Sequence, residues 1–416
     1  MRLKQAGLLT ATLLAFAPMQ TLAVEPAKAA EETGLIAAIK TGKPILDIRY
    51  RLEWVDSAAF TENAYANTIR TRLGYETGDF HKFKFLLEFE NVAAIGDDHF
   101  NSTTNGRTQF PVIADPNATE INRAQVSYAG IPKTTVTLGR QKFDLLNQRF
   151  VGAVDFRQNQ QTFDALRLTN GSIKRLAVDY LYLCRIHKVF GDDNPLGEID
   201  SDSHVLAATY DGGALGKLNG YGLLLDFDET PAASSATWGL RYVVTKVLDK
   251  QAGLSVGLVG EFALQRDYAD NPFDYEEAYL NGEVSVALGG WSGMLAYERL
   301  GGDGAIGFST PLATLHKFQG FADVFLTTPA AGVEDLSATA AYAWKAGPFG
   351  TDGRLYVVYH EFESERGGTD FGKEVDAGVN IALGKHWSAE VKGAIYDGRG
   401  AFPDRRVIWT SLRFQY

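Results

Sequence analysis

Arginines spaced two residues apart have the clearest chemical potential in this chain. Arg49 and Arg51 form one such pair, and Arg70 and Arg72 form another. A guanidinium group is a planar fork of N–H donors that binds carboxylate oxygens in a bidentate manner. Several such groups on one wall of an aqueous tube attract and guide anions. These residues raise the hypothesis of a path for anionic or carboxylate-bearing solutes.

The element that must position the first pair is a β-strand. Ile45–Trp54 alternates apolar with polar side chains, and its charged face carries Asp47, Arg49, Arg51 and Glu53. This period of two puts the charges on one side of a strand and the apolar side chains on the other. A soluble sandwich buries the apolar face, whereas a large membrane barrel turns it to lipid and the charges to a wet lumen. The number of such strands decides between these two folds.

The same alternation recurs along the chain, and it predicts an all-β fold: a transmembrane antiparallel β-barrel of about 18 strands, with short periplasmic turns and long extracellular loops. The further predicted strands are Ala66–Glu76, Lys82–Val92, Glu120–Tyr128, Thr134–Gln141, Thr162–Thr169, Arg175–Arg185, Ser203–Asp211, Asn219–Phe227, Ala236–Lys246, Gly253–Gln265, Tyr275–Leu288, Trp291–Arg299, Asp335–Lys345, Gly353–Phe362, Lys373–Leu383, Trp387–Tyr396 and Val407–Tyr416. The apolar run Phe318–Leu326 would make the count odd. We therefore expect it inside a long loop, folded toward the mouth of the pore.

The beginning of the chain is typical of an exported protein. A positively charged start and the apolar run Ala6–Ala17 precede small residues, which predicts a signal peptide over residues 1–23 with cleavage after Ala23. Cleavage near Ala29 or Ala30 is the alternative. The apolar run is too short for a membrane anchor.

The remaining chain divides into a short periplasmic segment, residues 24–44, and an outer-membrane barrel, residues 45–416. The final strand Val407–Tyr416 ends on an aromatic residue, as outer-membrane barrels usually do. Cys184 is the only cysteine, so no internal disulfide is possible. We therefore expect the protein in the outer membrane.

Closure of the barrel would place Arg413 of the last strand beside Arg49 and Arg51, next to Arg70 and Arg72. These five residues would form one basic wall that guides an anionic solute. The alternative is that ion pairs with Asp47 and Glu53 only stiffen the lumen. The acidic and basic residues predicted to face the lumen are nearly equal in number, so a simple count predicts no preference for anions or cations. The predicted pore-lining cations are Arg49, Arg51, Arg70, Arg72, Arg123, Arg167, Arg185, Arg241, Arg354, Lys392 and Arg413.

Two blocks of sequence resemble the alginate export family of outer-membrane porins. They are Thr137–Leu168, with its GRQ, RFVG and RQN–QTFDALRL elements, and Ser309–Thr328. The resemblance implies an arginine-rich conduit for acidic polysaccharide, narrowed by inserted loops, and a need for periplasmic export components. The residues that it assigns to the loop constriction are Arg140, Arg149, Arg157, His316, Lys317 and Asp323.

Other functions stay open at this stage. The main alternative is a diffusion porin, general or specific for a small solute, without polysaccharide export; an outer-membrane enzyme or adhesin is a further one. The seven histidines are scattered and no nucleophile motif accompanies them, so we expect no catalysis, no cofactor and no metal. The acidic loop 191–203 could bind calcium but lacks the EF-hand spacing. Outer-membrane lipids and lipopolysaccharide are expected partners, and the net charge of -11 gives no reason to expect nucleic acid. Residues 24–44 leave no room for a plug domain.

Overall fold

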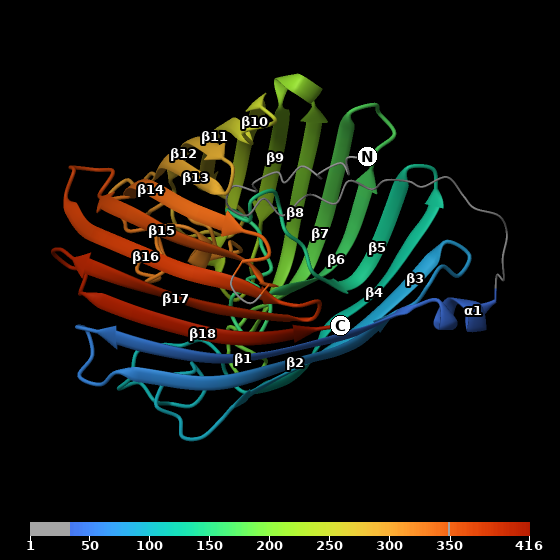
Figure 1. Cartoon of the computed structure of the whole chain (residues 1–416), viewed down its shortest axis with the longest axis horizontal. Coiled ribbons are helices and arrows are strands. Elements are labelled where there is room, and N and C mark those ends of the chain that lie inside the picture. Colours follow the sequence, from blue (N-terminus) through green and yellow to red (C-terminus); the bar gives the residue numbers. More distant parts are fainter. Residues whose placement is uncertain (1–33, 348–349) are drawn as a thin grey trace, which may run out of the picture.

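Eighteen antiparallel strands close into one barrel in the computed structural model, which describes residues 34–347 and 350–416 (Figure 1). Each strand pairs with its neighbours along the chain, and β1 also pairs with β18 to close the ring. The strands are β1 Lys43–Ser57, β2 Ala64–Glu76, β3 Phe83–Ala94, β4 Ala118–Ile131, β5 Thr134–Gln141, β6 Thr162–Asn170, β7 Leu176–His187, β8 Glu198–Asp211, β9 Lys217–Leu225, β10 Ser235–Asp249, β11 Leu254–Asp267, β12 Glu276–Leu288, β13 Trp291–Leu300, β14 Val333–Trp344, β15 Asp352–Glu363, β16 Asp370–Leu383, β17 Trp387–Gly398 and β18 Arg405–Gln415.

The predicted fold class and strand count are confirmed, and every predicted strand has its counterpart. The run Phe318–Leu326 lies in the loop between β13 and β14, as expected. The barrel begins at Lys43, slightly before the predicted residue 45. The predicted signal peptide, residues 1–23, lies outside the described residues.

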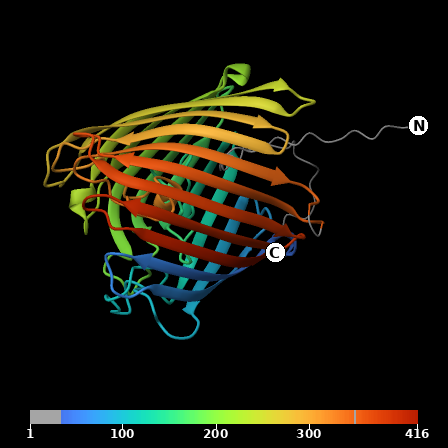
Figure 2. The same ribbon diagram turned by 60° about the vertical axis from the view of Figure 1, so that its left-hand side comes forward.

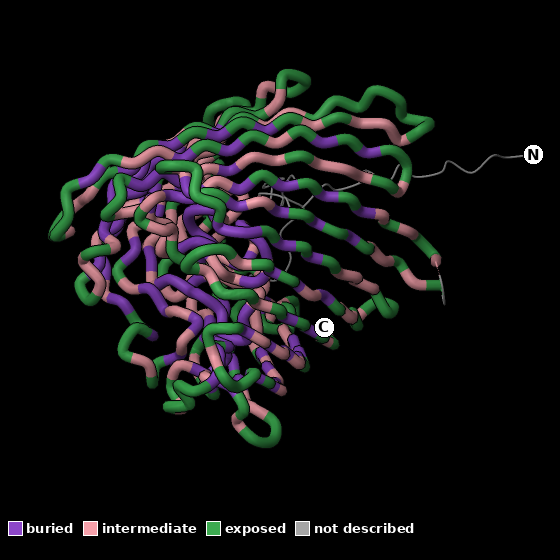
Figure 3. Tube along the Cα trace, turned by 90° about the vertical axis from the view of Figure 1, so that its left-hand side faces the viewer, coloured by how far each residue is buried: buried purple, intermediate pink, exposed green. Residues whose placement is uncertain are grey.

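Burial along the strands alternates, with polar residues inside and apolar residues outside (Figure 3). On β1, the inward Arg51 and Glu53 are 3% and 1% exposed. On β11, the outward Leu258 and Phe262 are 48% and 47% exposed. This is the reverse of a soluble protein and the arrangement that a lipid-facing wall requires. No helix in the described part of the chain is long and apolar enough to cross a membrane.

Long and short connections lie at opposite rims of the barrel. The connections 95–117, 142–161 and 301–332 follow odd-numbered strands, whereas the tight turns 132–133 and 289–290 follow even-numbered ones. In this architecture the long connections are extracellular and the short ones periplasmic. Both barrel ends, at Lys43 and Gln415, therefore lie at the short-turn rim.

The connections 142–161 and 301–332 fold inward and fill much of the lumen. We call them the first and second lumen loop; Figure 2 shows chain segments inside the ring of strands. Phe150 and Phe308, one from each loop, pack with their ring centroids 6.0 Å apart, and both contact Tyr279 of the wall. Inside the barrel, therefore, the two loops and the wall share an apolar core.

Backbone contacts also join the two lumen loops. Val151 and Leu312 form a parallel β-bridge, and Gly152 N donates to Leu312 O at 2.9 Å. The buried side chain of Gln161 donates to both Gly152 O and Leu312 O, at 2.7 and 2.9 Å. These bonds make the two loops one unit.

A short helix precedes the barrel. Helix α1, Leu35–Lys40, contacts the β2–β3 turn through a bond from Gly78 N to Ala38 O at 2.8 Å. Part of the segment 24–44 is thus docked on the short-turn rim of the barrel.

Candidate functional site

A row of arginines crosses the closing seam of the barrel. The strand register places Arg49 of β1 opposite Arg413 of β18 on one side and opposite Arg70 of β2 on the other. All share the parity of the buried, lumen-facing positions, as do Arg51 and Arg72. We call these five residues the arginine wall.

Ion pairs neutralise most of the arginine wall. Arg413 Nε donates to Asp47 Oδ1 at 2.9 Å, and Arg70 Nη2 lies 2.8 Å from the same oxygen. The other two paired members and their partners are Arg51 with Glu53 and Asp115, and Arg72 with Glu90. The ion pairs with Asp47 and Glu53 that the alternative interpretation expected are therefore present for Arg51, Arg70 and Arg413, whereas Arg72 pairs with Glu90 instead.

Arg49 differs from the other four because neutral groups surround its guanidinium. Nε donates to Gln158 Oε1 and Nη1 to the backbone oxygen of Asp155, both at 2.9 Å, and Nη2 donates to Arg157 O. Within the described chain, no carboxylate lies within ion-pair distance of it. Arg49 therefore adds an unbalanced positive charge next to the first lumen loop.

Several guanidinium N–H groups of the arginine wall lack hydrogen-bond acceptors. Arg70 is 0% exposed, yet its Nε and Nη1 have no partner among the described residues, and the same holds for Arg51 Nε. A buried donor without an acceptor costs about 1–3 kcal/mol. The arginine wall therefore contains buried donors whose hydrogen-bonding capacity is unused within the described chain.

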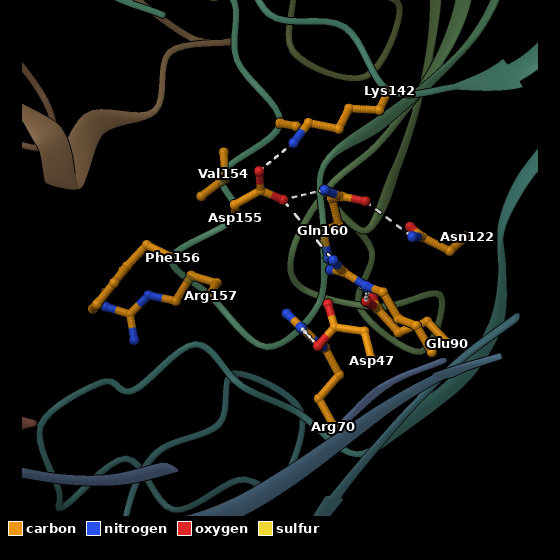
Figure 4. Close-up of polar contacts among 12 residues, drawn as sticks. Asp47, Arg70, Glu90, Asn122, Lys142, Val154, Asp155, Phe156, Arg157 and Gln160 are labelled. Carbon is orange, nitrogen blue, oxygen red and sulfur yellow. Dashed lines mark hydrogen bonds and ion pairs between the residues drawn. The ribbon is translucent and has the colours of Figure 1, made fainter. Parts of the chain in front are cut away.

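Asp155 ties the first lumen loop to the arginine wall (Figure 4). Its carboxylate accepts hydrogen bonds from Lys142 and Gln160, and Arg72 Nη1 lies 3.9 Å away. Burial acts to raise the pKa of Asp155, but the Lys142 ammonium outweighs it and the pKa is lowered. Asp155 is thus ionised at neutral pH and fixes the loop electrostatically.

His316 links the second lumen loop to the wall and to the first loop. Lys392 Nζ, an obligatory donor, lies 2.6 Å from His316 Nε2, so that nitrogen must be the acceptor. The proton is then on Nδ1, which donates to Asp323 Oδ1 at 2.8 Å. Phe156 stacks on the imidazole with a centroid separation of 3.4 Å. Burial lowers the pKa of His316 to about 4, so the ring is neutral at neutral pH.

Acidification is expected to destabilise these loop contacts. The unfolded chain binds a proton on His316 near its ordinary pKa of 6.5, but the folded chain does so only near 4. The free energy of unfolding should therefore fall as the pH drops through this window, by about 3 kcal/mol, and no further below it. Urea unfolding of the barrel in lipid vesicles would measure this, with His316→Gln as the comparison. An equal fall in the variant would show that another group is responsible.

Buried acids gather on a different side of the lumen. Glu298, Asp335, Glu374 and Asp376, on β13, β14 and β16, are each 8% exposed or less. Other lumen acids lie at the arginine wall itself, where Asp47, Glu53 and Glu90 are ion-paired with its arginines. The acids of β14 and β16 are thus a second acidic group, away from those that neutralise the arginine wall.

The remaining predicted pore-lining cations other than Arg185 have lumen-facing positions and local partners. Arg123 pairs with Glu88 and Arg167 with Asp179, while Arg241 pairs with Glu261. Arg354 lies 5.4 Å from the ring of Tyr356. Of the predicted constriction residues, those on the two lumen loops are Arg149, Arg157, His316, Lys317 and Asp323.

Two predicted site residues face away from the lumen. Arg140 was expected in a loop constriction, but it lies on β5 with the parity of the exposed Leu138 and pairs with Asp164 at 3.0 Å. Arg185 was expected inside, but a β-bulge between Leu183 and Arg185 reverses the alternation, and its side chain is 42% exposed. Both predictions were wrong, the first because Arg140 lies within the predicted strand and has its outward parity, and the second because a bulge shifts parity.

Several functional positions were not predicted. Asp115 and Gln158 bind the arginine wall from two different loops, and neither has a periodic pattern that would reveal it. Trp409, 2% exposed, lies inside the barrel, where it contacts Phe156 and His316 edge-on. The sequence signal for the inward position of Trp409 is its parity, which it shares with the other lumen-facing residues of β18.

No metal site emerges from the described ranges. Groups of three or more His, Cys, Asp or Glu side chains suited to a metal ion are absent between residues 34 and 347 and between 350 and 416. Asp192 and Asp193 in the acidic loop 191–203 are exposed. Calcium binding by this loop stays a hypothesis without structural support.

Known structures share this fold at low sequence identity. No family model and no curated protein match the chain. Pseudomonas aeruginosa OccK3 (OpdO) is similar with a TM-score of 0.65 and 15% identity, over 92% of this chain and 98% of that one. Acinetobacter baumannii OccAB4 gives 0.69 and 13%, over 90% and 98%. Pseudomonas aeruginosa OpdK, solved with vanillate, gives 0.67 and 12%, over 91% and 100%.

These neighbours correct the predicted family. They carry Occ and Opd names, one of them is described as an outer membrane protein, and none of those compared is named as an alginate exporter, so the resemblance to the alginate export family was wrong. The two blocks that suggested it are the lumen loops and adjoining strands, whose polar residues anchor an inserted loop. The fold and the exposed apolar belt place the protein in the outer membrane of a Gram-negative cell.

Proposed function

We propose that the barrel is a diffusion channel for small solutes that carry a carboxylate or a similar anionic group. The observation that supports this most directly is the arginine wall. Arg49 has only neutral contacts, and Arg70 has buried N–H groups without acceptors. A carboxylate matches such a site in both charge and geometry.

The lumen loops favour a small solute. The aromatic and aliphatic side chains of the two loops occupy the space beside the arginine wall, and the bridge between Val151 and Leu312 fixes the loops to each other. Arg149, Arg157 and the His316–Asp323 pair would form the narrow part of the path. Among the structural neighbours, OpdK was solved with vanillate, which is a small carboxylate.

The proposal predicts a defined loss of anion affinity in Arg49→Gln. Wild-type channels in planar bilayers should prefer anions in a salt gradient, and vanillate should block the current. Removal of one charge-assisted hydrogen bond, worth about 1.5–3 kcal/mol, should weaken the block on the order of tenfold or more. The reversal potential should shift toward cation selectivity.

Matched comparisons make the result specific. Arg185→Gln removes the same charge from the outer face and should leave both quantities unchanged. Vanillyl alcohol, the neutral analogue, should block neither protein. If Arg49→Gln retains the wild-type block by vanillate, the arginine wall does not bind the solute.

A further inference from the structure

Two adjacent lumen-facing acids on β16 hold the second lumen loop. Glu374 and Asp376 are 1% and 0% exposed. Ala322 N donates to Glu374 Oε1 at 2.7 Å, and Phe321 N donates to Asp376 Oδ2 at 3.1 Å. Consecutive amides of the loop thus bind consecutive inward positions of the wall.

No lysine or arginine of the described chain is ion-paired to either acid. From β15, His360 Nε2 lies 3.6 Å from Asp376 Oδ2, while its Nδ1 is 2.9 Å from Asp335 of β14. The imidazole of His360 therefore interacts with two aspartates. Among the described residues, no cationic side chain contacts Glu374. The more distant charged or titratable groups around the pair are Arg405 on β18, Tyr396 on β17, Tyr356 on β15, and Asp323 and His316 on the loop.

The pair also has two unsatisfied oxygens. Glu374 Oε2 and Asp376 Oδ1 are buried and accept no hydrogen bond from the described residues. The two carboxyl groups lie near each other, because they share one face of β16 and accept from the amides of the consecutive residues Phe321 and Ala322. Two ionised carboxylates in this position would repel each other, whereas one proton between them would satisfy both oxygens.

We propose that Glu374 and Asp376 share a proton at neutral pH and form a proton-operated latch for residues 318–323 of the second lumen loop. In alkaline solution the pair loses the proton and two charges face each other in a dry site. The strand positions are fixed by the barrel, so hydration of the charges requires the loop segment to move away. The channel should therefore widen as the pH rises.

Gly320 shows how closely the loop lies on the latch. It has φ +81°, and a Cβ at this position would meet the Glu374 carboxyl oxygen Oε2 at 2.5 Å. Gly320→Ala should therefore separate the loop from the pair without changing any titratable group. It should give high conductance at neutral and alkaline pH alike.

The proton can be tested without any transport measurement. Infrared difference spectra of the barrel in lipid should contain the carbonyl band of a buried protonated carboxyl at neutral pH, and alkali should remove it. The band should vanish in Glu374→Gln and persist in Glu361→Gln, which alters a partly exposed acid paired with Lys373 on the outer face. If the wild type lacks this band at neutral pH, or the Glu374→Gln variant retains it, there is no shared proton.

The latch itself rests on the proposed channel function and is tested by conductance. Wild-type conductance should rise severalfold between neutral and alkaline pH, and Glu374→Gln, which stays neutral, should abolish the rise. If the band titrates while wild-type conductance stays constant, the latch is overturned. A barrel that conducts at no pH contradicts the proposed function, and the infrared band still decides whether the proton is present.

Discussion

Replacing residues 303–330 by an Asn–Gly turn is expected to raise the single-channel conductance severalfold. The second lumen loop fills the lumen with buried side chains such as Phe308, Leu312 and Phe325. The barrel does not need the loop for closure, because Leu300 of β13 pairs directly with Val333 of β14. A hairpin turn can therefore join the two strands while the wall stays intact.

Loss of this loop should also abolish selectivity among small carboxylates, since the first lumen loop loses its partner at Val151. The measurements are conductance and vanillate block in planar bilayers. The control is the same turn in place of residues 58–63, a mostly exposed connection at the same rim. An unchanged conductance after removal of residues 303–330 would mean that the solute path does not run past this loop.

Arg149→Met is expected to destabilise the folded barrel by about 3–5 kcal/mol, because it leaves one member of a buried ion pair without its partner. Arg149 is 1% exposed, and its Nε lies 2.7 Å from Glu298 Oε1. The guanidinium also lies 4.8 Å from the Phe318 ring, and Tyr279 donates to the same Glu298 oxygen at 3.0 Å. The pair joins the first loop, the second loop and the wall.

Urea unfolding in lipid vesicles would measure this change in the free energy of unfolding. The double variant Arg149→Met, Glu298→Gln should recover much of the loss, since no charge is then buried alone. Arg399→Met removes an exposed pair with Asp397 and should cost only about 0–1 kcal/mol. A similar cost for Arg149→Met and Arg399→Met would show that water reaches the Arg149 site.

Strand alternation was sufficient to predict the barrel because lipid and lumen select side chains on every strand. β5 coincides with its predicted range, Thr134–Gln141. Most other strands differ from their predicted ranges by a few residues, and the largest difference at a strand start is in β8, which begins at Glu198 rather than Ser203. Its first outward residues are acidic and pair with Arg185 beyond the bulge, so the apolar alternation used for prediction is missing there.

The residues of the candidate site were predictable only where they lie on strands of the barrel. The register of β1 and β18 follows from ring closure, and the neighbourhood of Arg49 and Arg413 follows from that register. The partners of Arg49 could not be predicted, because Gln158 and the backbone oxygens of the first lumen loop depend on the path of an aperiodic segment. No repeating sequence pattern predicts the bulge that turns Arg185 outward.

The seam between β1 and β18 has a consequence for how the barrel reaches its native state. Asp47 and Arg413, which pair across it, are 366 positions apart in the chain. Contacts of such high sequence separation form late, because the entropy of closing the intervening chain must be overcome first. Until then one edge of β1 presents unpaired backbone groups to any other strand nearby. Substitutions at this seam should therefore alter the yield and rate of folding, and the unfinished barrel needs protection from aggregation until its last strand arrives.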